Sequence, residues 1–292
     1  MKGIILAGGA GSRLSPMTAA VSKQLLPVYD KPMIFYPLSV LLSAGICEIL
    51  VISGPRFCES FRALLGNGER FGARIFYKEQ ERPDGIARAF LLGEEFVGGE
   101  PCALALGDNV FFGKGLKSAL KRAAADARKG VNTLFCRPVD DVSPYSSVAF
   151  RGGVLTDIEE KPQGRAPGIA AVGLAFFGRG VMEYAKRVNA SPRGEYELTD
   201  VYRALIADGG LCARVLGKGY SWFDAGTAGR LFAASAAVRA AQKKGMLIGS
   251  PEAEAYRNGR ISLQALGHAA AAYKNSDYAE ALARFAEKES GA

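Results

Sequence analysis

The sequence predicts an α/β protein with a mostly parallel central sheet flanked by helices, a smaller mixed or antiparallel subsheet, and a C-terminal helical extension. Short apolar segments of strand length alternate with helical segments up to residue 136. Between residues 139 and 177, strand-like segments follow one another without long helices. From Thr227 onward the sequence is rich in alanine and helical in pattern. These three observations determine the fold class.

The first part of the chain predicts a Rossmann-like arrangement. Strands are expected over residues 4–7, 48–53, 74–77, 102–106 and 133–136, and helices over residues 33–44, 57–65, 85–96 and 116–128. Such alternation is typical of a parallel sheet covered on both faces, with ligands at the carboxyl ends of the strands. Gly11, Asp84 and Asp108 all follow predicted strands or lie in turns beside them, so they could share one cleft.

The later segments predict a different organisation. Strands are expected over residues 147–150, 154–158, 169–174, 213–215 and 220–223, and helices over residues 180–188 and 197–207. We expect residues 1–227 to form the α/β core, with residues 139–177 as an insert. Residues 228–292 would form a C-terminal helical region for oligomer or regulatory contacts, and both parts could belong to one structural domain.

Composition narrows the class of protein. Of the 292 residues, 49% are hydrophobic and 23% are charged, which is ordinary for a globular chain. No apolar run reaches transmembrane length, and the apolar stretch near the N-terminus is too short for a signal-peptide core. The five cysteines are scattered without C-x-x-C spacing and indicate thiols in a reducing compartment. We therefore expect a cytoplasmic protein with no membrane partner.

Charge and histidine content restrict the chemistry. The formal net charge of +8 could favour nucleic acid or a small anionic substrate. No block of five or more lysines and arginines occurs, so we expect no nucleic-acid partner. The single histidine, His268, lies in the alanine-rich C-terminal segment, far along the chain from the glycine-rich turns. A mechanism with a histidine base is therefore disfavoured.

The first predicted strand runs into a loop of glycines followed by Ser12 and Arg13. Glycine allows the backbone N–H groups to converge on an anion, and arginine adds a forked cationic donor. A dinucleotide fingerprint would need a third glycine where Leu14 stands, and a Walker loop would need Gly-Lys-Ser/Thr after Gly11. Both are absent, which disfavours a nicotinamide oxidoreductase. A glycine turn that merely reverses the chain remains open.

Including this loop, seven motifs occur in a specific order: Leu6-Ala7-Gly8-Gly9-Ala10-Gly11-Ser12-Arg13-Leu14, Ser22-Lys23-Gln24-Leu25-Leu26-Pro27, Tyr29-Asp30-Lys31-Pro32-Met33-Ile34, Leu106-Gly107-Asp108-Asn109, Glu159-Glu160-Lys161-Pro162, Arg193-Gly194-Glu195 and Trp222-Phe223-Asp224-Ala225-Gly226-Thr227. Together they closely resemble the bacterial glucose-1-phosphate thymidylyltransferases, within the sugar-nucleotidyltransferase superfamily. The resemblance runs from Lys2 to beyond Arg257.

The resemblance implies a reaction between dTTP and α-D-glucose 1-phosphate that yields dTDP-glucose and pyrophosphate, an early step toward dTDP-rhamnose. It implies Mg²⁺ as cofactor, held by Asp108 and Asp224. It also implies a homotetramer and a second site at which dTDP-rhamnose inhibits. Residues 251–257 resemble a helix of that second site, but Ala253 replaces an acidic residue there.

The resemblance also implies roles for individual residues. The nucleotide would lie on Gly8, Gly9, Gly11 and Ser12, with Arg13 on the leaving pyrophosphate, Lys23 beside the α-phosphate, Asp108 at the metal, and Gln24, Gln80 and Gly85 near the base. The sugar phosphate would contact Tyr145, Ser146, Glu160, Lys161, Ala171 and Arg193. The expected catalytic set is Arg13, Lys23, Asp108, Lys161 and Asp224.

Departures from the family pattern concentrate around the sugar. Where the family usually has Tyr-Gly-Val-Val-Glu-Phe, this chain has Tyr145-Ser146-Ser147-Val148-Ala149-Phe150, and where it usually has Ala-Val-Thr-Gly-Leu, this chain has Ala170-Ala171-Val172-Gly173-Leu174. A related enzyme with another nucleotide or hexose therefore stays open. A non-catalytic nucleotide-sugar sensor is a further alternative. Asp108 and Asp224 could also be helix caps, and the lysines and arginines could be solvated surface charges.

Overall fold

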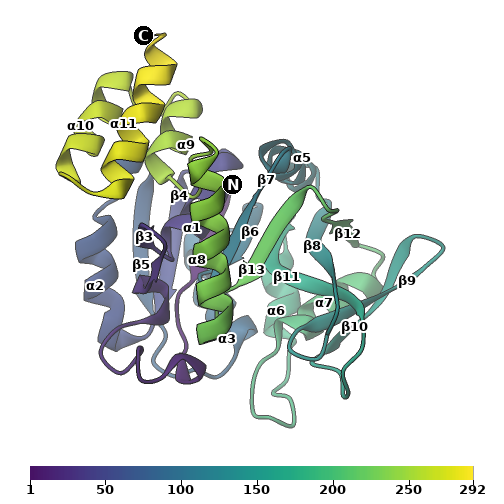
Figure 1. Ribbon diagram of the computed structural model, residues 1–292. Helices are drawn as coiled ribbons and strands as arrows, with labels where there is room; N and C mark the ends of the chain where they lie inside the picture. Colours follow the sequence, from purple (N-terminus) through teal and green to yellow (C-terminus); the bar gives the residue numbers. More distant parts are fainter. Residues whose placement is uncertain (292) are drawn as a thin grey trace.

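The computed structural model describes residues 1–291 and has at its centre one sheet of nine strands (Figure 1). Seven of its strands follow the spatial order β10-β9-β11-β6-β1-β4-β5, and β8 and β12 continue from β11. The strands of this sheet are β1 (Lys2–Leu6), β4 (Glu48–Ser53), β5 (Arg74–Glu79), β6 (Cys102–Leu106), β8 (Asn132–Val139), β9 (Ser146–Arg151), β10 (Val154–Glu160), β11 (Gly168–Phe177) and β12 (Leu211–Val215). The α/β fold with a mostly parallel central sheet is thereby confirmed.

Helices cover both faces of this sheet and extend beyond it at the C-terminal end (Figure 1). They are α1 (Phe35–Ser43), α2 (Pro55–Leu65), α3 (Ile86–Leu91), α4 (Glu94–Val97), α5 (Leu116–Arg128), α6 (Val181–Lys186), α7 (Leu198–Ala207), α8 (Ala228–Lys243), α9 (Pro251–Arg257), α10 (Leu263–Ala272) and α11 (Asp277–Ser290). None of the helices in residues 1–291 is both long and apolar enough to cross a membrane.

Alternation along the strands divides the core between the two faces. Ile5 and Val51 pack toward a cluster that includes α1, α2 and α5. Ile4 and Leu50, one residue earlier in each strand, pack toward a second cluster that includes α3, α6 and α7. Side chains of successive strand residues point to opposite faces, so a run of apolar residues fills both layers. This explains why the buried strands read as continuous apolar segments.

The parallel half of the sheet positions two of the predicted motifs. Strand β1 pairs in parallel with β4 and β6, and Leu6 lies in register with both Ile52 and Leu106. The Gly107 N–H donates to the Leu6 carbonyl oxygen at 2.9 Å. Therefore the glycine loop after β1 and Asp108 after β6 leave the same edge of the sheet side by side.

Strands β9, β10 and β11 pair antiparallel, but they continue the central sheet rather than forming a separate layer. Strand β12 pairs in parallel with β8. Strand β11 pairs antiparallel with β6, β8 and β9, and β9 pairs antiparallel with β10. The register of β8 against β11 shifts between Ala171 and Ala175. The long β11 thus joins the parallel half to the antiparallel half, and both contribute walls to one cavity.

Two small sheets complete the fold. Strand β2 (Pro27–Val28) pairs with β3 (Lys31–Pro32), and β7 (Asn109–Gly113) pairs with β13 (Tyr220–Asp224). The sequence analysis predicted no strand over 109–113, because the apolar residues of this segment follow β6 after a turn of only two residues.

The prediction of a single helix over 85–96 is also wrong, because the structure has two helices there, α3 and α4. A Cβ on Gly93, between them, would lie 2.5 Å from Ile4 Cδ1, so the backbone there packs directly on the sheet.

A buried polar cluster attaches the C-terminal helices to the core. The Lys31 ammonium group hydrogen bonds to Asp30 and to Gln242 Oε1, at 3.0 Å in the latter case, and lies 4.9 Å from the centroid of the Tyr278 ring. The fully buried Glu252 accepts hydrogen bonds from Tyr273 and Tyr278. The β2–β3 hairpin, α8, α9 and α11 are therefore joined through charged groups.

Replacing Lys31 by alanine is expected to lower the free energy of unfolding by about 3–5 kcal/mol, because the buried Asp30 would lose its cationic partner. Lys117→Ala is the matched control: its ammonium group lies 3.4 Å from Glu254 but is 36% exposed, so a loss of about 0–1 kcal/mol is expected. Urea unfolding of both variants measures the difference. Equal losses would contradict a structural role for the buried cation.

Candidate active site

A cavity of about 450 Å³ lies between the carboxyl ends of β1 and β6 and the antiparallel strands β9 to β11. Most residues predicted for the site line it, namely Gly8, Gly9, Arg13, Lys23, Gln24, Gln80, Gly85, Asp108, Tyr145, Ser146, Glu160, Lys161, Ala171 and Asp224. Three predicted residues do not line it: Gly11, Ser12 and Arg193. The cavity therefore combines residues from nearly the whole α/β core.

Glycines shape the end of the cavity near β1. Gly9 has φ +99° and Gly11 has φ +62°, both in the left-handed region that favours glycine. A Cβ on Gly11 would lie 3.0 Å from Thr18 Cγ2, and the Thr18 hydroxyl donates to the Gly11 carbonyl oxygen at 2.9 Å. Gly11 thus packs against Thr18 and does not line the cavity, whereas Gly8 and Gly9 do line it.

Two amide side chains lie beside this loop. Gln24 Nε2 is 3.4 Å from the Gly8 carbonyl oxygen, and Gln80 Nε2 donates to Asp84 Oδ1 at 3.2 Å. Gly85 has φ +118°, and a Cβ there would lie 2.4 Å from the backbone of Tyr196. Only glycine permits this close approach, which brings the segment before α7 against the segment before α3. Amides can donate and accept hydrogen bonds, as recognition of a base edge requires.

Asp108 is buried and forms an ion pair with Lys23. The Lys23 ammonium nitrogen lies 2.5 Å from Asp108 Oδ2, and Asn109 Nδ2 donates to Asp108 Oδ1 at 3.0 Å. Burial raises the pKa of the Asp108 carboxyl, but the charge of Lys23 and the two hydrogen bonds outweigh it, so the pKa is lowered. Asp108 is therefore a carboxylate at neutral pH.

Asp224 lies beside Asp108 because β7 and β13 are paired. Asp224 is in register with Asn109, and the Ala225 N–H donates to the Asp108 carbonyl oxygen at 2.9 Å. Its carboxylate accepts from Arg230 Nη1 at 2.8 Å and from the Gly226 N–H at 3.0 Å. Burial and the negative charge of Asp108 raise the pKa of Asp224. The two carboxylates thus repel each other across the cavity wall.

The donor set fits a divalent cation. Mg²⁺ prefers oxygen ligands and is commonly held by one or two carboxylates together with substrate phosphates. Asp108 and Asp224 supply two carboxylates, and a cation between them would relieve the repulsion that raises the pKa of Asp224. Within residues 1–291, no group of three or more His, Cys, Asp or Glu side chains forms a potential metal site.

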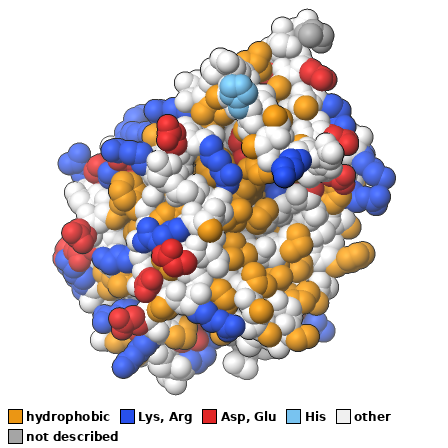
Figure 2. Space-filling view, turned by 90° about the vertical axis from the view of Figure 1, so that its left-hand side faces the viewer, with side chains coloured by type: hydrophobic (Ala, Val, Ile, Leu, Met, Phe, Trp, Pro, Cys, Tyr) orange, Lys and Arg blue, Asp and Glu red, His pale blue; other side chains and the backbone are white. Residues whose placement is uncertain are grey.

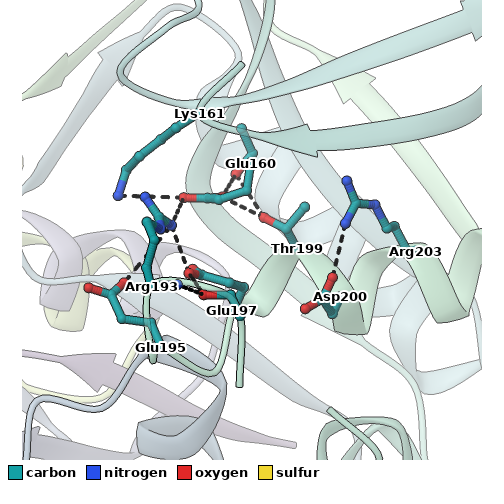
Figure 3. Close-up of polar contacts among 10 residues, drawn as sticks. Glu160, Lys161, Arg193, Glu195, Glu197, Thr199, Asp200 and Arg203 are labelled. Carbon is teal, nitrogen blue, oxygen red and sulfur yellow. Dashed lines mark hydrogen bonds and ion pairs between the residues drawn. The ribbon is translucent and has the colours of Figure 1, made fainter. Parts of the chain in front are cut away.

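Glu160 lines the cavity from the end of β10, and Figure 3 shows its polar contacts. Its Oε2 accepts from the hydroxyls of Ser146 and Thr199, both at 2.6 Å. Its Oε1 lies 3.6 Å from Lys161 Nζ and 3.4 Å from Arg193 Nη2. Burial raises the pKa of Glu160, but the two hydroxyls and the two cations outweigh it and lower the pKa. This carboxyl group is consequently ionised at neutral pH.

Arg193 lies at the boundary between this cavity and a neighbouring groove. It donates to Glu197 Oε1 at 2.7 Å and lies 4.0 Å from Glu195 Oε2, so three carboxylates surround it (Figure 3). Lys161, with φ +45°, lines both the cavity and the groove. Its side chain is 46% exposed, so it is accessible to a ligand in the cavity.

Several cavity residues were missed by the sequence reading. Trp222 donates from Nε1 to Asn109 Oδ1 at 2.6 Å, and its ring packs against Tyr145 with centroids 5.1 Å apart. Glu197 and Thr199 enter the cavity from the start of α7. Trp222 and Asn109 stand in the same sequence motifs as Asp224 and Asp108, so the sequence could have indicated them as site residues. Glu197 and Thr199 resemble ordinary helix-start residues, and only the fold brings them near Glu160.

The single histidine takes no part in this cavity. His268 is exposed on α10, and it appears on the outer surface in Figure 2. It does not line the cavity. The charged side chains that line the cavity are carboxylates, lysines and that of Arg13.

The family model described as "Nucleotidyl transferase" matches residues 2–241, which include every side chain that lines the cavity. The chain therefore belongs to the nucleotidyl transferase family. Within that family it is similar along almost its full length to proteins named glucose-1-phosphate thymidylyltransferase. The resemblance predicted from the sequence motifs is confirmed at this level.

Three comparisons illustrate the similarity. The thymidylyltransferase of Neisseria meningitidis is 44% identical over 99% of this chain and 100% of its own length. That of Mycolicibacterium smegmatis is 42% identical, again over 99% of this chain and 100% of its own length. A crystal structure from Bacillus anthracis, described as a glucose-1-phosphate thymidylyltransferase in complex with a sucrose, has a TM-score of 0.75 and 34% identity, covering 82% of this chain and 95% of the other.

The lowered pKa of Glu160 predicts a pH-dependent contribution to stability. A carboxyl group whose folded pKa lies below its unfolded value of about 4.3 stabilises the fold above that pH and loses this contribution as the pH falls through the folded pKa. Wild type should therefore exceed Glu160→Gln in unfolding free energy at neutral pH, and the gap should shrink below about pH 4. Urea unfolding across this range measures it. Glu195→Gln, at a 45% exposed side chain, is the control, and the same trend in both variants would refute the assignment.

Proposed function

We propose that this chain converts dTTP and α-D-glucose 1-phosphate to dTDP-glucose and pyrophosphate. One observation carries the proposal: a single cavity joins a glycine loop with Arg13 and Lys23 at one end to Glu160 and Lys161 at the other, with two aspartates beside them. This arrangement suits two phosphate-bearing ligands that must meet. The names of the relatives supply the particular nucleotide and sugar.

The chemistry suits the side chains present. A sugar phosphate has a second pKa of about 6, by analogy with phosphorylated side chains, so the attacking oxygen is mostly ionised at neutral pH. No general base is needed. The protein must instead hold two anions in line and stabilise charge at the α-phosphate.

Different cationic side chains would bind the nucleotide phosphates and the sugar phosphate. The Gly8–Gly9 backbone and Arg13 would hold the nucleotide phosphates, with Gly11 and Ser12 shaping the loop. Lys23 would stand beside the α-phosphate, and Lys161 would hold the sugar phosphate, assisted by Arg193. For Arg193 to do so, its guanidinium group would have to leave Glu197, to which it now donates.

The remaining residues would bind the base, the sugar and the metal. Gln24, Gln80 and Gly85 would contact the thymine, and Tyr145, Glu160 and Ala171 would border the hexose. Asp108 and Asp224 would hold Mg²⁺, which when bound neutralises phosphate charge and favours the in-line geometry. Lys23 keeps Asp108 ionised and so ready to serve as a ligand.

We further propose a cytoplasmic homotetramer whose C-terminal helices, residues 228–292, provide subunit or regulatory contacts. All five cysteines are unpaired, which fits a reducing compartment. A second site for dTDP-rhamnose would involve α9. In α9, Ala253 is fully buried. Its methyl group cannot replace the carboxylate of the acidic residue that the family has at this position.

Pyrophosphate release with Mg²⁺ tests the reaction when dTTP, UTP, CTP, ATP and GTP are each combined with glucose, galactose, glucosamine and mannose 1-phosphates. We expect the highest kcat/KM for dTTP with glucose 1-phosphate. UTP lacks one methyl group and should react about 10–200-fold more slowly. A different preferred pair would refute the specificity. Nucleotide binding without turnover for any pair would favour a sensor instead.

Asp108→Asn and Asp224→Asn are each expected to lower kcat by about 10²–10³-fold, because charge stabilisation at the phosphates would be lost. EDTA should abolish turnover of the wild type, and added Mg²⁺ should restore it. Binding of Mn²⁺ in the presence of dTTP, followed by electron paramagnetic resonance, should weaken in both variants. Asp126→Asn, outside the cavity, is the control. Normal turnover and Mn²⁺ binding in the aspartate variants would contradict the metal assignment.

A further inference from the structure

Three oxygen-bearing side chains from different elements meet at the sugar end of the cavity. Ser146 begins β9, Glu160 ends β10, and the antiparallel register places them opposite each other. Thr199 comes from α7. The Ser146 and Thr199 hydroxyl oxygens are 3.0 Å apart, and each lies 2.6 Å from Glu160 Oε2. Both hydroxyls therefore converge on one carboxylate oxygen.

The hydrogen bonds already made within the triad of Ser146, Glu160 and Thr199 determine which donors and acceptors remain for a ligand. A hydroxyl has one proton and two acceptor lone pairs, and an ionised carboxylate only accepts. Charge-assisted bonds are the stronger ones, so the Ser146 and Thr199 protons are both drawn to Glu160. The lowered pKa of Glu160 agrees with this. Only acceptor capacity remains on the three side chains toward the cavity.

The second oxygen of Glu160 is not free to change this arrangement. Glu160 Oε1 faces Lys161 Nζ at 3.6 Å and Arg193 Nη2 at 3.4 Å. The carboxylate is thus held on one side by hydroxyls and on the other by cations. Its orientation is fixed before any ligand arrives, and such preorganisation strengthens discrimination between ligands.

Ser146 also contributes volume. All three members of the triad line the cavity, and Ser146 is only partly buried, so its side chain forms part of the wall that a ligand would meet. A glycine at this position would leave the Thr199 bond to Glu160 in place. It would remove both a bond to the carboxylate and the volume of the side chain.

We propose that Ser146 is a specificity-determining residue for the sugar phosphate. With Thr199 it fixes Glu160, and the resulting surface of acceptors selects hexose 1-phosphates that present a compact hydroxyl donor there. It disfavours sugars that lack this hydroxyl and sugars that carry a bulky acylated group in its place. A site built to pair with a hydroxyl rejects the analogue without it, because its own polar groups would remain unpaired. This inference rests on the proposed function.

The test compares wild type with Ser146→Ala, Ser146→Gly and Ser146→Thr. The substrates are glucose 1-phosphate, its four monodeoxy analogues at positions 2, 3, 4 and 6, and N-acetylglucosamine 1-phosphate. We expect wild type to reject at least one deoxy analogue, and Ser146→Ala to reduce that discrimination about 5–30-fold. Ser146→Gly should in addition raise the relative kcat/KM for the N-acetylated sugar. Ser146→Thr keeps the hydroxyl and should retain the wild-type pattern.

Ser147→Ala provides the matched control, since Ser147 is next along β9 and does not line the cavity. The KM for the sugar phosphate should rise in Ser146→Ala, while the KM for dTTP stays within about twofold of wild type. The proposal is overturned if Ser146→Ala and Ser147→Ala give the same pattern, or if the two KM values rise together.

The proposed function is tested separately by turnover of the wild type itself. If the wild type shows no turnover, calorimetric binding of the same sugar phosphates to the same variants replaces kcat/KM. A loss of discrimination confined to Ser146→Ala and Ser146→Gly would support the role of Ser146. Unchanged relative affinities would overturn it.

Discussion

The parallel pairing of β1 with β6 is the constraint on which the site depends. It places the glycine loop after Leu6 beside the segment after Leu106, and so brings Lys23 to Asp108. The charge of Lys23 then keeps the buried Asp108 ionised, despite the cost of burial. Without this pairing, the glycine loop and the Lys23–Asp108 ion pair would not come together. The geometry of this end of the cavity is therefore a direct product of sheet topology.

A second constraint is the long strand β11. It pairs with β8 along one edge and with β6 and β9 along the other edge, so it attaches the antiparallel half to the parallel half. The same continuity brings Glu160 at the end of β10 into the cavity that Gly8 enters from β1. A single sheet thus supplies both ends of the cavity, which the proposed function assigns to the nucleotide and to the sugar phosphate. Under that proposal, one cavity would hold the two anionic ligands in contact.

Electrostatics differ between the two ends. Near β1 and β6, burial and the negative charge of Asp108 raise the pKa of Asp224. At the other end, Glu160 is stabilised by hydroxyls and cations, which lower its pKa. The first environment favours a divalent cation, whereas the second is already satisfied by the protein. A carboxylate that already has hydroxyl and cation partners is suited to orienting a sugar hydroxyl, and two neighbouring carboxylates that repel each other are suited to holding a metal ion.

The sequence by itself determined the strands of the parallel half, the glycine loop and the family, because apolar runs and glycine turns are local signals. It could not determine that β7 would pair with β13, that Gly85 would lie against Tyr196, or that Ser146 and Thr199 would share one oxygen of Glu160. These contacts join segments far apart in the chain, and their residues look ordinary locally. Only the tertiary structure decides them, because long-range pairing sets which polar groups meet.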